Sequence, residues 1–218
     1  MKKHKGISII MVPTDAEGFE WTPLHTVGDH MTTSTYYSDV RVPRTNLIGK
    51  LNEGWSLITM QLNHERVGLA ALSGLTERLL DDVTQWCRET KSGLPAHKTM
   101  IDVPWVQSDL AKCTAICKAI RLMTWRLVNA VADNTLDPAE SSSVKVFGTE
   151  QMVECYRLLQ GIVGAAGHLR EGSPGAILHG ELERANRASQ INTFGGGVNE
   201  IQRELVATAG LGLSLIHI

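Results

Sequence analysis

Glu65 is the residue whose position in this sequence most clearly suggests chemistry. It falls in a row of apolar residues spaced three and four apart: Ile58, Leu62, Glu65, Leu69 and Leu72. Residues with that spacing share one face of a helix. A carboxylate held among apolar side chains loses hydration, which makes it a better base at neutral pH. The row therefore predicts a general base, although a core ion pair with an arginine from another helix would perturb the carboxylate as well.

The second candidate is the run of three glycines at residues 195–197. A helix is expected to begin just after it, because Asn199 and Gln202 have the spacing of a capping box with Asn as the cap. Glycines let backbone N–H groups approach a ligand closely, and a helix N-terminus favours anionic or electron-rich groups. The run indicates a ligand-binding loop, and a plain flexible turn is an equal alternative.

Other chemical patterns are weaker. Arg66 lies on a different face from Glu65, and a lone arginine is usually a solvated group unless its context makes it a phosphate contact. The glycines of residues 161–167 follow an expected helix rather than a strand, so a dinucleotide fingerprint is rejected. The eight histidines have no metal-ligand spacing, so no metal site is expected.

Two kinds of element must position these residues. Period-two alternation between turn signals predicts strands over residues 6–13, 19–24 and 36–42. Spacing of three and four predicts helices from Glu53 toward Gly93, from Pro104 to Asp133, from Pro138 to Ile162, over 176–188 and from Asn199 onward. Strands followed by long helices with short connections predict the end of a β-domain and then an antiparallel helical bundle.

Composition narrows the classes of partner. The 218 residues carry a net charge of −2 and have a pI near 6.4, which gives no electrostatic reason to expect nucleic acid or an anionic membrane. No stretch has the apolar run that a membrane helix needs, and the start lacks a signal-peptide cleavage pattern. The four cysteines predict reduced core thiols in a cytoplasmic protein rather than a disulfide framework.

Both ends of the chain suggest a fragment. Residues 6–13 would form a strand with nothing in front of it to pair with. Leu213–Ile218 is an apolar tail without charge, and it resembles a translated transposase adaptor used in sequencing. This tail is therefore expected to be non-native.

Taken together, these pieces resemble the acyl-CoA dehydrogenase family. Six phrases in family order carry the resemblance: Gly6–Pro13, Val40–Pro43, Asn46–Gly49, Gly54-Trp55, Asn63–Val67 and Phe194–Arg203. Within the family the chain looks most like the actinobacterial dehydrogenases of steroid side-chain breakdown. Four further phrases carry that closer likeness: Trp105–Gln107, Arg121–Trp125, Lys145–Gly148 and Thr193–Gly197.

The resemblance implies a mostly α fold class with three segments. Residues 1–52 would be the second half of the middle β-domain, 53–212 a C-terminal antiparallel four-helix bundle, and 213–218 the non-native tail. The absent first half normally supplies strands that contact the flavin ring and part of the acyl pocket. The polypeptide alone is therefore expected to be a poor enzyme.

The reaction that the resemblance implies is α,β-desaturation of an acyl-CoA thioester with FAD as cofactor. A carboxylate removes the α-proton while the β-hydrogen is transferred to FAD. Most members carry that carboxylate at the position matching Gly196, where this chain has none. A subset, of which isovaleryl-CoA dehydrogenase is the known type, carries it at the position matching Glu65. The resemblance thus selects the residue that the apolar row had singled out.

Further roles are carried over residue by residue. Arg66 matches an arginine near the CoA moiety, and Gly196, Gly197, Val198 and Glu200 match the segment that touches FAD. Val198 replaces a usual threonine and lacks its hydroxyl. The implied partners are an acyl-CoA substrate, bulky or steroid-derived, an electron-transfer flavoprotein, and a homologous subunit in a homo- or hetero-oligomer.

Two departures from the family pattern bear on the oligomer. The Arg-x-x-Phe-Gly flavin contact is absent from residues 88–97, and the Gln-x-x-Gly-Gly-x-Gly-Tyr loop survives only as residues 161–168. Both normally complete the FAD site of a neighbouring subunit. Their loss favours a heteromer of unlike chains with fewer flavins than subunits.

Three other functions stay open from the sequence. One is an oxygen-using oxidase or monooxygenase of the same fold. Another is a catalytically silent partner subunit that serves as a scaffold. The blandest is a helical bundle that binds nothing, which leaves Glu65 in its apolar row without an explanation.

Overall fold

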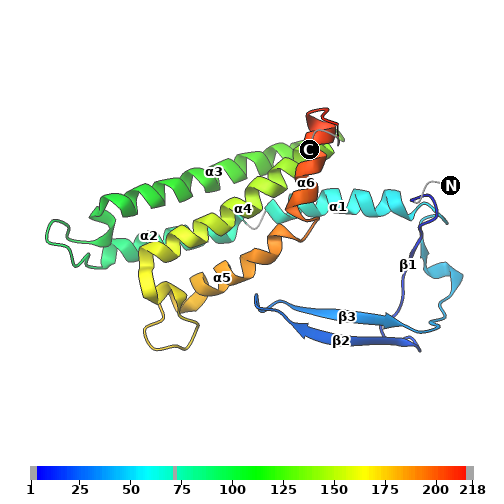
Figure 1. Cartoon of the computed structure of the whole chain (residues 1–218), viewed down its shortest axis with the longest axis horizontal. Coiled ribbons are helices and arrows are strands. Elements are labelled where there is room, and N and C mark those ends of the chain that lie inside the picture. The colour runs from blue at the N-terminus through cyan, green and yellow to red at the C-terminus, as the bar shows by residue number, and fades with distance from the viewer. Residues whose placement is uncertain (1–3, 71–72, 215–218) are drawn as a thin grey trace. The chain divides into compact units, whose positions relative to one another are not determined.

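The computed structural model of the chain describes residues 4–70 and 73–214, without the side chains of Asn63, Arg66, Val67, Leu69 and Ala70 (Figure 1). The chain divides into two compact units, Met1–His64 and Glu65–Ile218. Helix α1 (Gly54–Ala70) runs across the boundary between them. Strands come first and long helices follow, so the predicted, mostly α fold class is confirmed.

The strands of the first unit form two small antiparallel pairs. β2 (Phe19–His25) pairs with β3 (Met31–Tyr37), with Phe19 opposite Tyr37 and His25 opposite Met31. The rings of Phe19 and Tyr37 meet edge to face, with centroids 5.2 Å apart. β1 (Ile9–Ile10) pairs with β4 (Leu47–Ile48), which follows a 3₁₀ turn at Arg44–Asn46.

Two of the strand predictions are wrong in extent. The strand expected over residues 6–13 is only Ile9–Ile10, and the one expected over 36–42 ends at Tyr37. The reason for the second error is local. Ser38 N–H donates to Gly18 O at 2.8 Å, and Asp39 adopts a φ of 51°, which an extended strand cannot accommodate. The short strand β4 was not predicted at all.

The helices of the second unit agree better with the sequence. They are α2 (Ser73–Glu89), α3 (Pro104–Ala132), α4 (Pro138–Val163), α5 (Glu181–Ser189) and α6 (Asn199–Leu205), which a π-helical turn at Val206–Gly210 extends. α3 and α4 begin at prolines as predicted, because proline at the first helical position loses no hydrogen bond. The helix expected from Glu53 is described as α1 and α2, and residues 71–72 lie outside the described ranges.

α5 begins five residues later than residue 176, where the sequence placed its start. A 3₁₀ turn at Leu178–Gly180 precedes it, and Leu178 and His179 have φ values of 49° and 52°. Residues with left-handed backbone conformations interrupt a right-handed α-helix. Residues 176–180 therefore do not form α-helix, although their spacing predicted it.

α4 is the central helix of this unit. The sequence predicted one buried face, but side chains on most of its circumference are buried, including Val144, Met152, Tyr156 and Leu159. α3 runs beside it (Figure 1), and Tyr156 Oη lies 2.9 Å from Thr76 Oγ1 of α2. α5 and α6 also pack on α4, so several polar residues of this helix are buried, although Arg157 remains exposed.

The C-terminal tail is described only in part. Of the tail 213–218, residues 215–218 lie outside the described part of the chain, and Leu213 N–H donates to Ala207 O at 2.9 Å. No helix among the described residues is long and apolar enough to cross a membrane.

All four cysteines are buried and unbridged, as predicted. Cys87 of α2 has no exposed surface, and burial raises the pKa of its thiol to about 11 because the thiolate would lose its hydration. The folded protein therefore keeps a proton that the unfolded chain releases from about pH 9 upward.

We therefore predict that this thiol makes the free energy of unfolding fall as the pH rises from 9 to about 11. Denaturant unfolding of the full-length protein at several pH values measures the slope. Cys87→Val is the control, since it fills the same site without a titrating group and should give a shallower fall. Equal slopes in the two proteins would contradict the prediction.

Candidate functional site

The glycine run lies in a segment with a defined conformation, residues 193–199, which we call the glycine loop. A 3₁₀ turn at Gln190–Thr193 leads into it, and α6 begins at its end. Gly196 and Gly197 have φ values of 69° and 101°, a region that favours glycine. A Cβ on Gly197 would lie 2.3 Å from Nε2 of Gln202, which is buried. The loop is therefore a shaped segment rather than a plain flexible turn.

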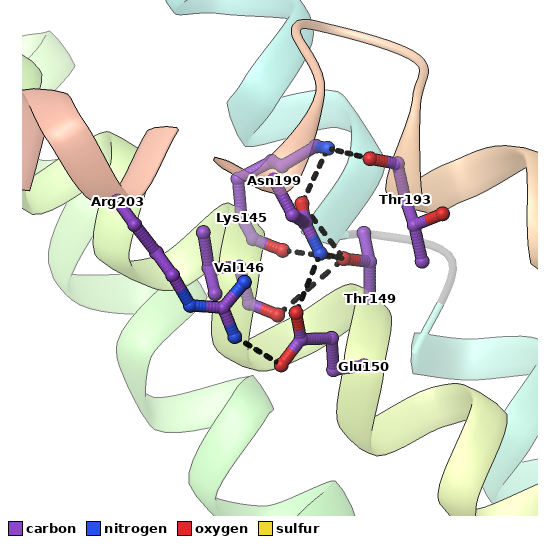
Figure 2. A network of polar contacts seen from close by, with 7 residues as sticks. All are labelled: Lys145, Val146, Thr149, Glu150, Thr193, Asn199 and Arg203. Carbon is purple, nitrogen blue, oxygen red and sulfur yellow. Dashed lines mark hydrogen bonds and ion pairs between the residues drawn. The ribbon is translucent and has the colours of Figure 1, made fainter. Parts of the chain in front are cut away.

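Lys145 of α4 holds both ends of the glycine loop. Its side chain is only 2% exposed. Its ammonium donates to the carbonyls of Thr193 at 3.1 Å and Gly197 at 2.6 Å, and to Oδ1 of Asn199 at 2.6 Å; Figure 2 shows the contacts with Thr193 and Asn199. A lysine ammonium has three donors, and a buried charge is tolerated only when such donors are satisfied. The loop carbonyls accept two of these hydrogen bonds, so the burial of the lysine and the conformation of the loop depend on each other.

Asn199 connects Lys145 to Thr149 and Glu150 (Figure 2). While its Oδ1 accepts from Lys145, its Nδ2 donates to Thr149 Oγ1 at 3.1 Å and to Glu150 Oε1 at 3.0 Å. The other oxygen of Glu150 accepts from Arg203 of α6 at 2.7 Å. This last ion pair is partly exposed and contributes less than about 1 kcal/mol. The buried hydrogen bonds of Asn199 with Lys145 and Thr149 therefore contribute more to holding the start of α6 against α4.

The predicted capping box at the start of α6 is wrong. Val198 occupies the N-cap position, and no side chain caps the helix. The amide of Asn199 is already used by Lys145 and its neighbours on α4. Gln202 instead accepts a hydrogen bond from Ser142 Oγ at 2.9 Å. Both side chains thus join α6 to α4 instead of closing its own first turn.

Glu65 is exposed, which corrects the expectation that an apolar row would remove its hydration. Ile58 and Leu62 of the same row are half-buried. A row of residues on one helix shields a carboxylate only when a second element packs over it. The exposure also argues against the alternative of a core ion pair. The side chain of Arg66, the predicted CoA contact, lies outside the described residues.

Three of the four residues predicted to touch FAD lie in the second half of the glycine loop, and the fourth lies in the first turn of α6. Gly196 is buried, Gly197 and Val198 are half-buried, and Glu200 is exposed on the first turn of α6. The sequence reasoning missed Lys145, Thr149 and Glu150 as their supports. A signal was present: Lys145, Thr149, Met152 and Tyr156 are spaced four, three and four apart. All four are buried.

The match to known proteins identifies the chain. Residues 52–211 match the model of the acyl-CoA dehydrogenase C-terminal domain. The chain belongs to the acyl-CoA dehydrogenase family. The resemblance stated from the sequence phrases is therefore confirmed.

Acyl-CoA dehydrogenase FadE26 of Mycobacterium tuberculosis is 47% identical to this chain over 215 residues, which cover 97% of this chain and 53% of that protein. The structure of the Tcur3481-Tcur3483 steroid ACAD is 50% identical with a TM-score of 0.90, over 98% of this chain and 54% of the other. The ChsE4-ChsE5 complex from M. tuberculosis is 47% identical with a TM-score of 0.88, over 98% and 55%. This chain thus spans about half the length of the relatives it matches.

The glycine loop fits a flavin in two respects. Residues 195–197 carry no side chains, so a large planar group can approach this stretch of backbone closely. The loop is also fixed by a buried lysine, so it needs little ordering when a ligand binds. No cluster of three or more His, Cys, Asp or Glu that could hold a metal ion is found in the ranges the structure describes.

We predict that Gly197→Ala destabilises the full-length protein by about 1–3 kcal/mol, because alanine is strained at a φ of 101° and its Cβ would collide with Gln202. Gly195→Ala is the matched control in the same run. A Cβ there has Ile191 O as its nearest neighbour, at an ordinary 3.7 Å. Thermal unfolding compares the two variants, and equal losses of stability would contradict the assigned conformation.

Proposed function

We propose that this chain is the C-terminal portion of a FAD-dependent acyl-CoA dehydrogenase that desaturates the α,β-bond of an acyl-CoA thioester. The observation that carries the proposal is the glycine loop anchored by Lys145, which matches by resemblance the segment of the family that touches FAD. In this proposal residues 1–52 are the second half of the middle β-domain, 53–212 the helical domain, and 213–218 a non-native tail.

Gly196, Gly197, Val198 and Glu200 would hold FAD. Bound there, FAD supplies the oxidising power of the reaction by accepting the β-hydrogen with its two electrons. This chain contributes backbone amides at residues whose lack of side chains permits close approach. Val198 lacks the hydroxyl of the usual threonine, so its contribution to binding is limited to its backbone and its apolar side chain.

Glu65 would remove the α-proton of the thioester. Gly196 stands where most family members carry the catalytic carboxylate, and glycine has no group that takes a proton. By resemblance, Glu65 matches the alternative family position, and it lies on α1. Because the carboxylate is exposed in this chain, the dehydration that a base of this kind needs would come from the rest of the polypeptide, a second subunit or the bound acyl group. Arg66, next to it, would contact the CoA moiety.

The substrate would be a bulky, steroid-derived CoA ester. The support is the likeness of about 50% identity to a structure described as a steroid ACAD. Electrons would pass to an electron-transfer flavoprotein. The exposure of Glu65 favours one rival, in which this chain is a silent subunit and an unlike partner carries the chemistry. The other rival proposal is an oxygen-using oxidase or monooxygenase of the same fold. Sensitivity of the turnover rate to oxygen distinguishes it from a dehydrogenase.

The first test replaces the proposed base. In the full-length protein, co-expressed with the product of its genomic neighbour, Glu65→Gln should retain FAD but lose flavin bleaching by a steroid side-chain CoA ester by about 10³-fold or more. Removing the proposed proton acceptor blocks the chemical step without altering the proposed flavin contacts. Anaerobic stopped-flow absorbance measures the bleaching rate.

Glu89→Gln is the matched control, because Glu89 is an exposed carboxylate at the end of α2. It should bleach at the wild-type rate. Unchanged bleaching in Glu65→Gln would move the chemistry to the partner subunit and leave this chain a scaffold.

The flavin content of the assembled protein tests the oligomer. Residues 88–97 and 161–168 lack the family phrases that complete a neighbour's FAD site, so we expect a heteromer with fewer FAD molecules than chains. Native mass spectrometry together with the flavin absorbance gives the ratio. One FAD per chain in a homotetramer would contradict the heteromer.

A further inference from the structure

We infer that Lys145 is a positioning residue for the flavin site: its buried ammonium sets the conformation of the glycine loop and directs the Val198 N–H away from α4, toward the ligand. The inference rests on the proposed function, since it assigns a support to the residues proposed to touch FAD. Lys145 touches none of the reacting atoms and acts only through the loop.

Three acceptors converge on the Lys145 ammonium. The carbonyls of Thr193 and Gly197 stand on either side of residues 194–196, and both accept from the same ammonium. One charged group therefore closes the segment into a turn. The third acceptor, Asn199 Oδ1, attaches the start of α6 to the same point. An apolar side chain of similar size would leave all three oxygens without this donor.

The hydrogen bond from Lys145 also orients the peptide between Gly197 and Val198. The described chain has no cis peptide bonds, and in a trans peptide the C=O and the following N–H point in opposite directions. The Gly197 carbonyl points at Lys145, at 2.6 Å. The Val198 N–H consequently points away from α4. This backbone donor replaces the hydroxyl that Val198 does not have.

Lys145 also fixes the orientation of the Asn199 amide. Lys145 can only donate, so Oδ1 must face it, and Nδ2 must face Thr149 and Glu150. Glu150 carries a negative charge and is linked to Lys145 by two hydrogen bonds, one to each end of this amide. The arrangement satisfies the buried charge without placing a carboxylate in the loop itself.

The test uses the full-length protein with its partner subunit, in wild type and in Lys145→Met. Methionine has a similar length but no donor. Hydrogen exchange of the amides of residues 194–198, measured without FAD, should accelerate about tenfold or more, since a loop that loses charged hydrogen bonds opens more often. The FAD dissociation constant should rise by about the same factor.

Leu159→Ala is the control for stability alone. Leu159 is a fully buried apolar residue of α4, and its site is about 20 Å from Lys145 along the helix. It should lower the melting temperature without accelerating exchange in the glycine loop or weakening FAD. Asn199→Ala is the second variant, in case Lys145→Met does not fold, and it should change both readouts in the same direction.

Each outcome has a defined meaning. Exchange in residues 194–198 that stays at the wild-type rate in Lys145→Met and Asn199→Ala overturns the inference. Faster exchange with unchanged FAD affinity also overturns it, because the loop conformation would then not serve the flavin. A wild-type protein that binds no FAD overturns the proposed function, while the exchange rates still decide whether Lys145 shapes the loop.

Discussion

The structure of the second unit depends on the burial of one positive charge. An ammonium group removed from water is costly unless each of its donors finds an acceptor, and Lys145 finds its acceptors in the glycine loop and in Asn199. The chain must therefore bring two carbonyls and an amide oxygen to one point on α4. Glycine is needed at residue 197 because the backbone that meets this demand has a φ of 101°. The first turn of α6 has no side-chain cap, because the amide of Asn199 is bonded to Lys145 instead.

The two halves of the proposed site are supported in different ways. The glycine loop is supported within this chain, by α4 beneath it and by α6 after it, so its conformation is complete in the described residues. Glu65 has no comparable support here, since it stands exposed on α1. A cofactor contact made by backbone needs only a fixed loop. A base that must be dehydrated needs a covering element as well, and this chain spans about half the length of its relatives.

Local chemistry explains which elements the sequence could predict. The starts of α3 and α4 follow from Pro104 and Pro138, because proline has no N–H to lose at a helix start. The end of β3 could not be predicted, because it depends on a hydrogen bond from Ser38 to Gly18, twenty residues earlier in the chain. The capping box failed similarly. Its spacing is correct, but Asn199 and Gln202 have better partners on α4 than the first turn of their own helix.

Glu65 and Lys145 separate what sequence and tertiary structure each determined. The sequence by itself determined the family, the order of the elements and the glycine run, since these depend on residue identity and on spacing along the chain. Glu65 falls in a row of apolar residues and is exposed, whereas Lys145 falls in a row that includes Thr149 and is buried. Spacing places a residue on a face of its helix, whereas only packing decides whether another element covers that face. α6 and the glycine loop cover Lys145 and supply its acceptors. The burial of Lys145 is therefore determined by the tertiary structure and not by the spacing of residues along the chain.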